Sequence, residues 1–334
     1  MNIELYNRFL KSTFNIVVSE QMEIDTVIYV KTGELIRRKD GRKFEIRNYI
    51  PRLVKDDNYT ESFGYQWNKF RNLQHDSLNG KTLTEKRLIS NTEWNKEELA
   101  GKVVLECGCG PGRFTEQFYY MDAIIIAIDM SGAIDVNLSN LGLHPNILYI
   151  QDDITNLYYM KEKADYVFCY GVLQHTPNPY RTLHRLGRYA KPGGRLSVDV
   201  YRKMIQPNPF YGPKYFWRPI TKNMNQEKLL KILQWYIPKY IGFDTKLRKY
   251  TVGGVAIGKY ILGIIPIPCW NYPKMGYSDE ERVQHAIMDT FDALSPKYDR
   301  PCSYKELDIW AKKENYKEYK VAYGSNGLVL NAIR

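Results

Sequence analysis

The chain of 334 residues exceeds the usual size of one domain and is long enough to bury a substantial core. Hydrophobic residues make up 44% and charged residues 25%, which is ordinary globular usage and excludes a disordered or fibrous chain. The formal net charge of +11 favours an anionic partner such as nucleic acid, a phosphorylated metabolite or a membrane surface, but solubilising surface charge explains it equally well.

Cysteine usage and apolar runs bear on the compartment. The five cysteines are odd in number and form no CxxC pair, which argues against a disulfide framework or a zinc knuckle. The first residues lack the pattern of a signal peptide. The most apolar stretch, residues 252–268, is interrupted by Lys259 and ends in prolines, so it is a poor transmembrane candidate. We expect a cytoplasmic protein without a transmembrane segment, with peripheral membrane contact left open.

Residues 1–100 precede the main domain in two parts. In residues 1–58 the β-type runs TVIYV, LIRR, KFEIR and IPRLV alternate with turn signals at Gly33 and Asp40-Gly41, which predicts a small antiparallel β module. Residues 59–100 are rich in aromatic residues and become helical in pattern. We expect them to form a linker over the ligand site of the domain that follows.

Residues 101–201 alternate buried strands with helices. VVLEC, IIIAID, ILYIQ, ADYVFCY and RLSVDVY are the strands, and this alternation predicts a parallel sheet with right-handed crossovers. Residues 202–302 leave the pattern and are expected to be a mainly helical insertion that contacts substrate. In residues 303–334 a capping box, Ser303 with Glu306, opens a helix, and two strands follow as an antiparallel hairpin. The fold class predicted is α/β, a Rossmann-like doubly wound sheet of seven strands.

The chemistry is concentrated where these strands end. Glycines at 108, 110 and 112 let the chain turn tightly after the first strand and approach a ligand closely. Glu106 places an acid beside that turn, which disfavours a diphosphate and suits an ammonium group. Asp129 ends the next strand, where a carboxylate accepts from ribose hydroxyls, and Asp153 follows the third strand, where it suits an adenine amino group. A glycine turn alone is weak evidence, so a nicotinamide-dependent oxidoreductase stays an alternative.

Four motifs in order carry a family resemblance. VLECGCGPGRFT, AIDMS, IQDDITNL and ADYVFCYGVLQHTPNP resemble the class I S-adenosylmethionine (SAM)-dependent methyltransferases, especially the ubiquinone-biosynthesis and saccharide-cluster enzymes. The resemblance implies SAM as the cofactor. It places the methionyl part at Glu106, Gly108, Gly110 and Arg113, the ribose at Asp129 and Met130, the adenine at Asp153 and Ile154, and the space beside the sulfonium at Tyr170 and Gly171. A SAM-binding protein without catalysis is a further alternative.

Methyl transfer needs alignment of donor and acceptor more than a catalytic base. An alcohol acceptor must lose its proton, and His175 is the best-placed base, although bracing its loop is an equal interpretation. No cluster has metal-ligand spacing, so we expect no metal. The module at residues 1–58 resembles a zinc-ribbon-like leader of saccharide-cluster methyltransferases, but its cysteines are absent and no zinc is expected.

The acceptor is the least determined feature. The strand ending in Cys169-Tyr170-Gly171-Val172 lacks the motif of amino-methylating DNA enzymes, which disfavours nucleic acid and leaves RNA as an alternative. Residues 201–302 combine aromatic with basic side chains, a combination that suits an anionic sugar. The side chains concerned are Tyr201, Tyr211, Tyr215, Trp217, Trp235, Tyr236, Trp270 and Tyr272, with Arg202, Lys214, Arg218 and Lys222. We expect a small-molecule acceptor, most simply a hydroxyl of a sugar or sugar-linked intermediate; N-methylation stays open, and the sequence predicts no oligomeric state.

Overall fold

The computed structural model describes the chain except for residues 56–57, 72, 204–211, 253–256, 266 and 273–275. Tyr211 lies outside the described residues. The chain divides into two compact units, one made of residues 1–202 with 298–334 and the other of residues 203–297. Each unit is described by itself.

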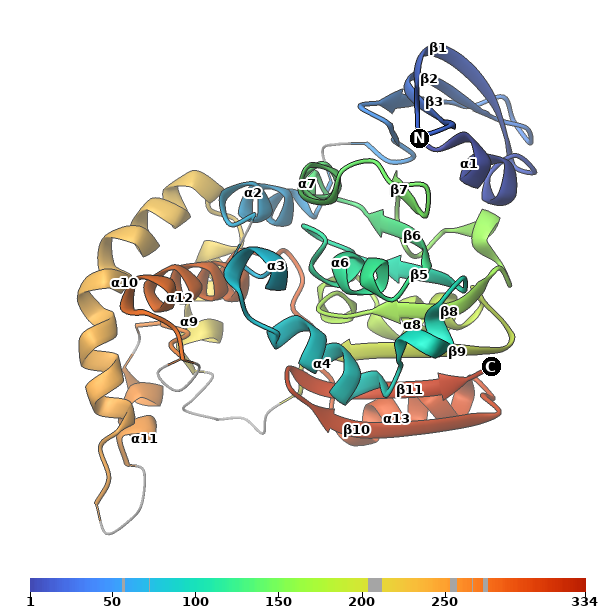
Figure 1. Cartoon of the computed structure of the whole chain (residues 1–334). Helices are drawn as coiled ribbons and strands as arrows, with labels where there is room; N and C mark the ends of the chain where they lie inside the picture. Colours follow the sequence, from blue (N-terminus) through green and yellow to red (C-terminus); the bar gives the residue numbers. More distant parts are fainter. Residues whose placement is uncertain (56–57, 72, 204–211, 253–256, 266, 273–275) are drawn as a thin grey trace. The chain divides into compact units, whose positions relative to one another are not determined.

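The first unit is built on a seven-stranded sheet, in the order β10-β11-β9-β8-β5-β6-β7 (Figure 1). The strands are β5 (Val103–Cys107), β6 (Ile124–Asp129), β7 (Ile147–Gln151), β8 (Ala164–Cys169), β9 (Ala190–Val200), β10 (Glu318–Gly324) and β11 (Gly327–Ile333). Strands β5 to β9 pair in parallel, whereas β11 is antiparallel to both β9 and β10. The predicted doubly wound sheet with a closing hairpin is confirmed.

Helices cover both faces of this sheet, which is why its strands are apolar on both sides. One face buries side chains of α4 (Leu83–Thr92), α6 (Arg113–Tyr120) and α7 (Ala133–Leu141). The other face buries side chains of α8 (Pro179–Gly187) and α13 (Tyr304–Lys313) together with residues of the amino-terminal module. The predicted capping box of α13 is present, since Ser303 and Glu306 exchange both hydrogen bonds.

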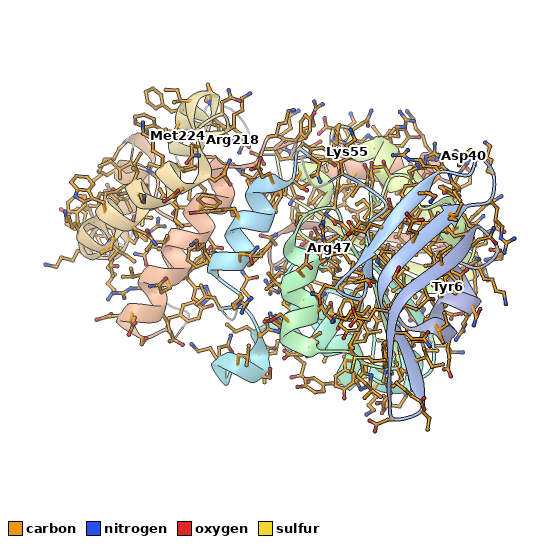
Figure 2. All side chains as sticks on the ribbon, turned by 90° about the horizontal axis from the view of Figure 1, so that it is seen from above. Tyr6, Asp40, Arg47, Lys55, Arg218 and Met224 are labelled. Atoms are coloured by element: carbon orange, nitrogen blue, oxygen red, sulfur yellow. The ribbon has the colours of Figure 1, made fainter. Side chains whose placement is uncertain are left out.

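The amino-terminal module is a four-stranded antiparallel sheet with one helix. It comprises α1 (Ile3–Phe9), β1 (Phe14–Ile24), β2 (Val27–Arg37), β3 (Lys43–Arg47) and β4 (Ile50–Pro51). Figure 2 shows Tyr6 on α1, Asp40 at the hairpin between β2 and β3, and Arg47 at the end of β3. The first hairpin, formed by β1 and β2, has strands of 11 residues each and is longer than the sequence pattern predicts.

Two expectations for this module were wrong. Strand β1 was not predicted, and the turn expected at Gly33 lies inside β2, which joins the TVIYV and LIRR runs. A Cβ at Gly33 would stand 2.3 Å from the carbonyl oxygen of Val17, beside an irregularity in the register of β1. The glycine therefore permits close approach of two strands rather than a reversal of the chain.

Arg52, just after β4, joins the module to the edge of the large sheet. Its guanidinium donates to both carboxylate oxygens of Asp135, at 2.6 and 2.8 Å, and to the side-chain oxygen of Gln151 at 3.0 Å. The backbone of Leu53 also donates to the carbonyl of Gln151. Arg52 is buried, so this bidentate pair fixes the module beside β7.

Residues 58–100 form short helices: α2 (Glu61–Lys69), α3 (Asp76–Asn79), α4, and α5 (Lys96–Leu99). Asn95 caps α5 by accepting from the backbone of Glu98, and Gly80 ends α3 in a left-handed conformation. This segment is helical, in agreement with its aromatic, helix-period pattern.

The second unit is mainly helical, as predicted. It holds α9 (Gly212–Thr221), α10 (Gln226–Arg248), α11 (Ile257–Ile264) and α12 (Asp279–Leu294). Helix α10 spans 23 residues and continues through Pro238. Its buried side continues across the proline with Leu233, Ile237 and Ile241, and this packing supports the helix where the proline removes a backbone donor. No helix in the described part of the chain is long and apolar enough to span a membrane.

Arg218 of α9, marked in Figure 2, differs from its predicted role as a substrate cation. It is buried, and its guanidinium donates to the carbonyl oxygens of Ala293 and Pro296 at the end of α12. A cation at a helix carboxyl terminus satisfies carbonyls that have no partner within the helix. Arg218 thus holds α9 to α12 and does not serve as a substrate contact.

Candidate functional site

The glycine turn between β5 and α6 has the conformation that glycine alone adopts easily. Gly108 and Gly112 have φ of +82° and +98°. A Cβ at Gly108 would stand 2.2 Å from a methyl of Val172, and one at Gly112 would stand 2.3 Å from the side-chain oxygen of Asn137. Both glycines are therefore required by backbone shape and by space. The backbone at Gly110 faces the indole of Trp67.

Glu106, at the end of β5, is a buried carboxylate. It accepts a hydrogen bond of 2.6 Å from the hydroxyl of Thr115, which in turn accepts from Asn137. Loss of hydration raises the pKa of Glu106 to about 8. Among the described residues no lysine or arginine is paired with it. An ammonium group bound at this place would supply the missing positive charge.

Asp129, at the end of β6, is fixed by three donors. The backbone of Gly110 donates to one oxygen at 2.8 Å, and the backbone and hydroxyl of Ser131 donate to the other at 2.8 and 2.7 Å. Desolvation raises its pKa. An ionised carboxylate offers about four acceptor positions, so capacity remains for ribose hydroxyls. The next residue, Met130, presents its carbonyl to the amides of Asn58 and Gln151.

Beyond β7 lie two acids in sequence with different surroundings. Asp153 accepts from the backbone of Thr155 at 2.8 Å. Asp152 is buried, accepts from the hydroxyl of Tyr159 at 2.9 Å, and has its pKa raised to about 7 by desolvation. Ile154 is buried, and its carbonyl accepts from Tyr189. Asp153 is therefore the acid of the two that remains nearer the surface, where a ligand could reach it.

After β8 the chain turns at Gly171, which has φ of +75° and lies in open space, since a Cβ there would meet no atom within 4 Å. Its backbone donates to the buried carboxylate of Asp199 on β9. The ring of Tyr170 stacks on Phe168, and its hydroxyl bonds to Ser197. The side chain of Tyr170 therefore belongs to the core, and a contact of its backbone with the sulfonium stays a prediction.

Arg87 of α4 contacts the same carboxylate, Asp199, and this contact was not predicted from the sequence. Its guanidinium donates to Asp199 at 2.5 Å and lies over the rings of Phe114 and Tyr170, at 5.6 and 5.7 Å from their centroids. The pair is mostly buried. Nothing in the sequence spacing links residues 87 and 199, because the contact depends on how α4 packs on the sheet. Arg87 and Asp199 together fix the loop at Gly171.

Arg113 begins α6 and lies beside the glycine turn. It donates to the side-chain oxygen of Gln74 at 2.7 Å, and its guanidinium lies 4.8 Å from the centroid of the Phe114 ring. These contacts tie α6 to the segment before α3. Its contact with the methionyl part of a ligand stays a prediction.

His175 lies in the loop after β8 and is almost fully buried. Its Nδ1 is 2.9 Å from the carbonyl oxygen of Tyr298, and its ring packs edge-on against Phe63 and Tyr201. A carbonyl oxygen only accepts, so this contact assigns the proton to Nδ1 and the lone pair to Nε2 in the neutral ring. A second histidine, His184 of α8, lies outside this loop and pairs with Glu314.

The start of the linker lies along this same edge. Asn58 donates to Met130, and Tyr59 packs on Tyr298 at 5.2 Å between ring centroids. Burial, followed by the charge of Asp153 nearby, raises the pKa of Tyr59. Phe63 packs on His175, and Trp67 faces Gly110. Aromatic side chains of this segment therefore lie beside residues that follow β5, β6 and β8, and its role as a cover of the cofactor site stays a prediction.

Comparison with known proteins identifies the family. A family model described as "Methyltransferase domain" matches residues 105–198. A ubiquinone biosynthesis O-methyltransferase of Azotobacter vinelandii is 34% identical over 194 residues, which cover 55% of this chain and 77% of that protein. The chain belongs to the class I SAM-dependent methyltransferases. A relative of the same name from Coxiella burnetii is 36% identical over 107 residues, 31% of this chain and 46% of that protein. The match thus spans less than half the length of the first curated relatives.

Solved structures give more distant likenesses. A SAM-dependent methyltransferase from Aquifex aeolicus is 13% identical, with a TM-score of 0.40 over 81% of this chain and 96% of that one. Human N-acetylserotonin methyltransferase in complex with SAM is 11% identical, with a TM-score of 0.44 over 84% of this chain and 60% of that one. These scores add nothing to the family assignment, which the sequence relatives establish.

The residues present fit the SAM that this methyltransferase family uses. Glu106 is a buried acid with no cationic side chain paired to it in the described part of the chain, which suits the methionyl ammonium, and Asp129 retains acceptor capacity for the ribose. The glycine turn leaves backbone where a side chain would obstruct a ligand. Among the described residues no group of three or more His, Cys, Asp or Glu side chains is arranged to hold a metal ion.

Proposed function

We propose that this methyltransferase transfers the methyl group of SAM to a hydroxyl of a small molecule, and that a sugar or sugar-linked intermediate is the acceptor. The observation that carries the oxygen acceptor is the fixed tautomer of His175, whose Nδ1 is held by the carbonyl of Tyr298. A hydroxyl needs a base to remove its proton, whereas an amine attacks with its own lone pair.

SAM supplies an electrophilic methyl group. With SAM bound, the acceptor oxygen would take the methyl group with the thioether as leaving group, and Nε2 of His175 would accept the hydroxyl proton. The Tyr298 carbonyl then stabilises the imidazolium through the proton already on Nδ1. Phe63 and Tyr201, packed on the ring, exclude water and hold its plane.

The cofactor contacts are part of the same proposal. Glu106 pairs with the ammonium, Asp129 accepts from the ribose, and Asp153 meets the adenine amino group. Gly108, Gly110, Arg113, Met130, Ile154 and the backbone of Tyr170 and Gly171 complete the contacts. Tyr59 and Trp67 join this set because they lie over the same strand ends.

The choice of acceptor rests on residues 202–302. Their aromatic and basic side chains support an anionic sugar, although Arg218 is withdrawn from that set because it holds α12. The names of the curated relatives favour a second acceptor class, a phenol of quinone biosynthesis. A phenol, with an ordinary pKa of about 10, ionises more easily than a sugar hydroxyl, so it depends less on His175.

A methyl-transfer assay with labelled SAM tests the proposal. Nucleotide sugars, a lipid-linked saccharide extract, a catechol and total RNA are offered in parallel to the wild type, His175→Gln and His184→Gln. We expect label in a saccharide pool and a loss of about 10²- to 10⁴-fold in His175→Gln, with little change in His184→Gln. Label in the catechol selects the second acceptor class. Label in RNA, or equal activity of both variants, contradicts the proposal.

A further inference from the structure

The helix α10 has two sides of opposite character. Side chains at Leu230, Leu233, Ile237, Ile241 and Asp244 are buried along one side. At 100° per residue the opposite side carries a run of residues with helical spacing, which we name the α10 stripe. The stripe consists of Lys228, Lys231, Ile232, Trp235, Lys239, Gly242, Phe243 and Lys246, all exposed.

The stripe combines large apolar side chains with a single sign of charge. Ile232, Trp235 and Phe243 are 40%, 67% and 52% exposed. Four lysines flank them, and the ammonium of Lys239 lies 4.2 Å from the centroid of the Trp235 ring. A solvated helix face normally mixes charges of both signs and exposes few aromatic residues.

Acidic side chains of α10 lie outside the stripe. Glu227 lies about 40° from the edge of the stripe at Lys231 and pairs with Lys231 at 2.7 Å. Asp244 is buried on the opposite side and pairs with Arg248 at 2.6 Å. The positive charge of the stripe is therefore little offset along the helix itself.

We propose that the α10 stripe docks this protein on an anionic lipid bilayer. Trp, Phe and Ile on one face, with lysines beside them, are the composition of helices that lie in a membrane interface: the apolar groups enter the acyl boundary and the lysines extend to the headgroups. The charge complements an anionic surface, as does the net charge of +11. Aliphatic Ile232 and the apolar Phe243 gain from lipid, whereas a phosphate backbone would use the lysines alone.

The same unit exposes a second apolar pair that is consistent with this surface. Phe216 and Ile220, one turn apart on α9, are 64% and 58% exposed. Since no described helix can cross a bilayer, the contact is peripheral. No residue of the stripe belongs to the cofactor site, and Trp235, which the sequence analysis grouped with the aromatic side chains suited to an acceptor, is assigned to the stripe instead.

Vesicle co-sedimentation of the whole chain tests it. Vesicles of phosphatidylcholine alone are compared with vesicles containing one-fifth phosphatidylglycerol, at increasing NaCl. We expect binding to the anionic vesicles that weakens with salt. In the triple variant Lys228→Gln, Lys239→Gln, Lys246→Gln the partition coefficient should fall about a hundredfold, since each basic residue near an anionic surface contributes about fivefold.

The apolar part of the stripe is tested separately. Trp235→Ser with Phe243→Ser should lower binding at least about tenfold, whereas Tyr323→Ser, an exposed aromatic on β10, should not change it. Circular dichroism and SAM binding verify that each variant is folded. Absence of vesicle binding, equal binding to neutral vesicles, or unchanged binding in both stripe variants overturns the proposal. So does a loss of RNA binding in these variants while vesicle binding stays intact.

Discussion

Binding of SAM should be linked to a proton on Glu106. In the ligand-free protein, loss of hydration raises the pKa of this buried carboxyl to about 8, so it is largely protonated at neutral pH. The proposed partner is the methionyl ammonium, which pairs with the ionised form. Binding must therefore expel a proton from Glu106 at any pH below about 8.

The size of the effect follows from that pKa. With a value of about 8, about 0.3% of the carboxyl is ionised at pH 5.5 and about 9% at pH 7. If only the ionised form binds well, the dissociation constant should fall about thirtyfold between these two pH values. The ammonium of the ligand stays protonated over this interval, since an α-amino group titrates near pH 8.

Isothermal titration calorimetry measures both consequences. Titrations at pH 5.5, 6.2 and 7 give the affinity, and buffers with different ionisation enthalpies give the number of protons released, expected to approach one. S-adenosylhomocysteine should behave as SAM does because it keeps the ammonium. Methylthioadenosine lacks it and should show only the pH dependence of the adenosine side, including that of Asp129, whose pKa desolvation raises.

Glu106→Gln is the matched variant because it keeps the shape and removes the titration. It should bind SAM more weakly at pH 7 and release no proton from residue 106. The affinity of this variant for SAM should vary with pH no more than its affinity for methylthioadenosine does. If wild-type SAM binding varies with pH no more than methylthioadenosine binding does, the ammonium does not pair with Glu106. Equal proton release by Glu106→Gln would also refute the reasoning.

Further outcomes follow from single contacts. The folded pKa of Glu106 lies above the ordinary 4.5, so the ligand-free protein should lose stability as pH rises from about 5 to about 8, and a thermal melt should show a smaller loss in Glu106→Gln. Arg52→Met should lower the free energy of unfolding by about 1–3 kcal/mol, a value discounted because Asp135 is 40% exposed. Arg8→Met is the control, and an unchanged denaturant unfolding curve for Arg52→Met would refute this prediction. Gly171→Ala and Gly41→Ala share a positive φ and open space, so each should cost about 1–2 kcal/mol, but only Gly171→Ala should reduce methyl transfer. EDTA should leave SAM binding by calorimetry unchanged, and loss that zinc restores would contradict this.

The parallel sheet was predictable because its signals are local. Apolar runs such as Val103–Cys107 and Ile124–Asp129 carry an acid in one of their last two positions, and the carboxyl ends of parallel strands meet at one edge. The capping box at Ser303 was equally local, since its two partners lie three residues apart. Order along the chain therefore fixed which acids share an edge.

The structural features that the sequence did not predict depend on contacts between segments far apart in the chain. Arg87 and Asp199 are 112 residues apart in sequence, and no period connects them. A turn was predicted at Gly33 because the sequence does not distinguish a glycine that permits close approach of two strands from one that permits reversal of the chain. Pro238 is a local signal against a continuous helix, but burial on both sides of it outweighs one lost backbone donor. In each case tertiary packing overrode a local signal.

The acids at the carboxyl edge of the sheet explain why the site suits a cationic ligand. Asp199 is paired with the guanidinium of Arg87. Glu106 and Asp129 instead accept from hydroxyl and backbone donors, which orient a carboxylate without neutralising its charge. Desolvation raises the pKa of both, and the ligand-free protein lowers this cost by keeping a proton on Glu106. A ligand bearing an ammonium and a sulfonium supplies positive charge to the same edge. Burial raises the free energy of the ionised carboxylates when the ligand is absent. The same burial strengthens their attraction to the positively charged ligand when it binds.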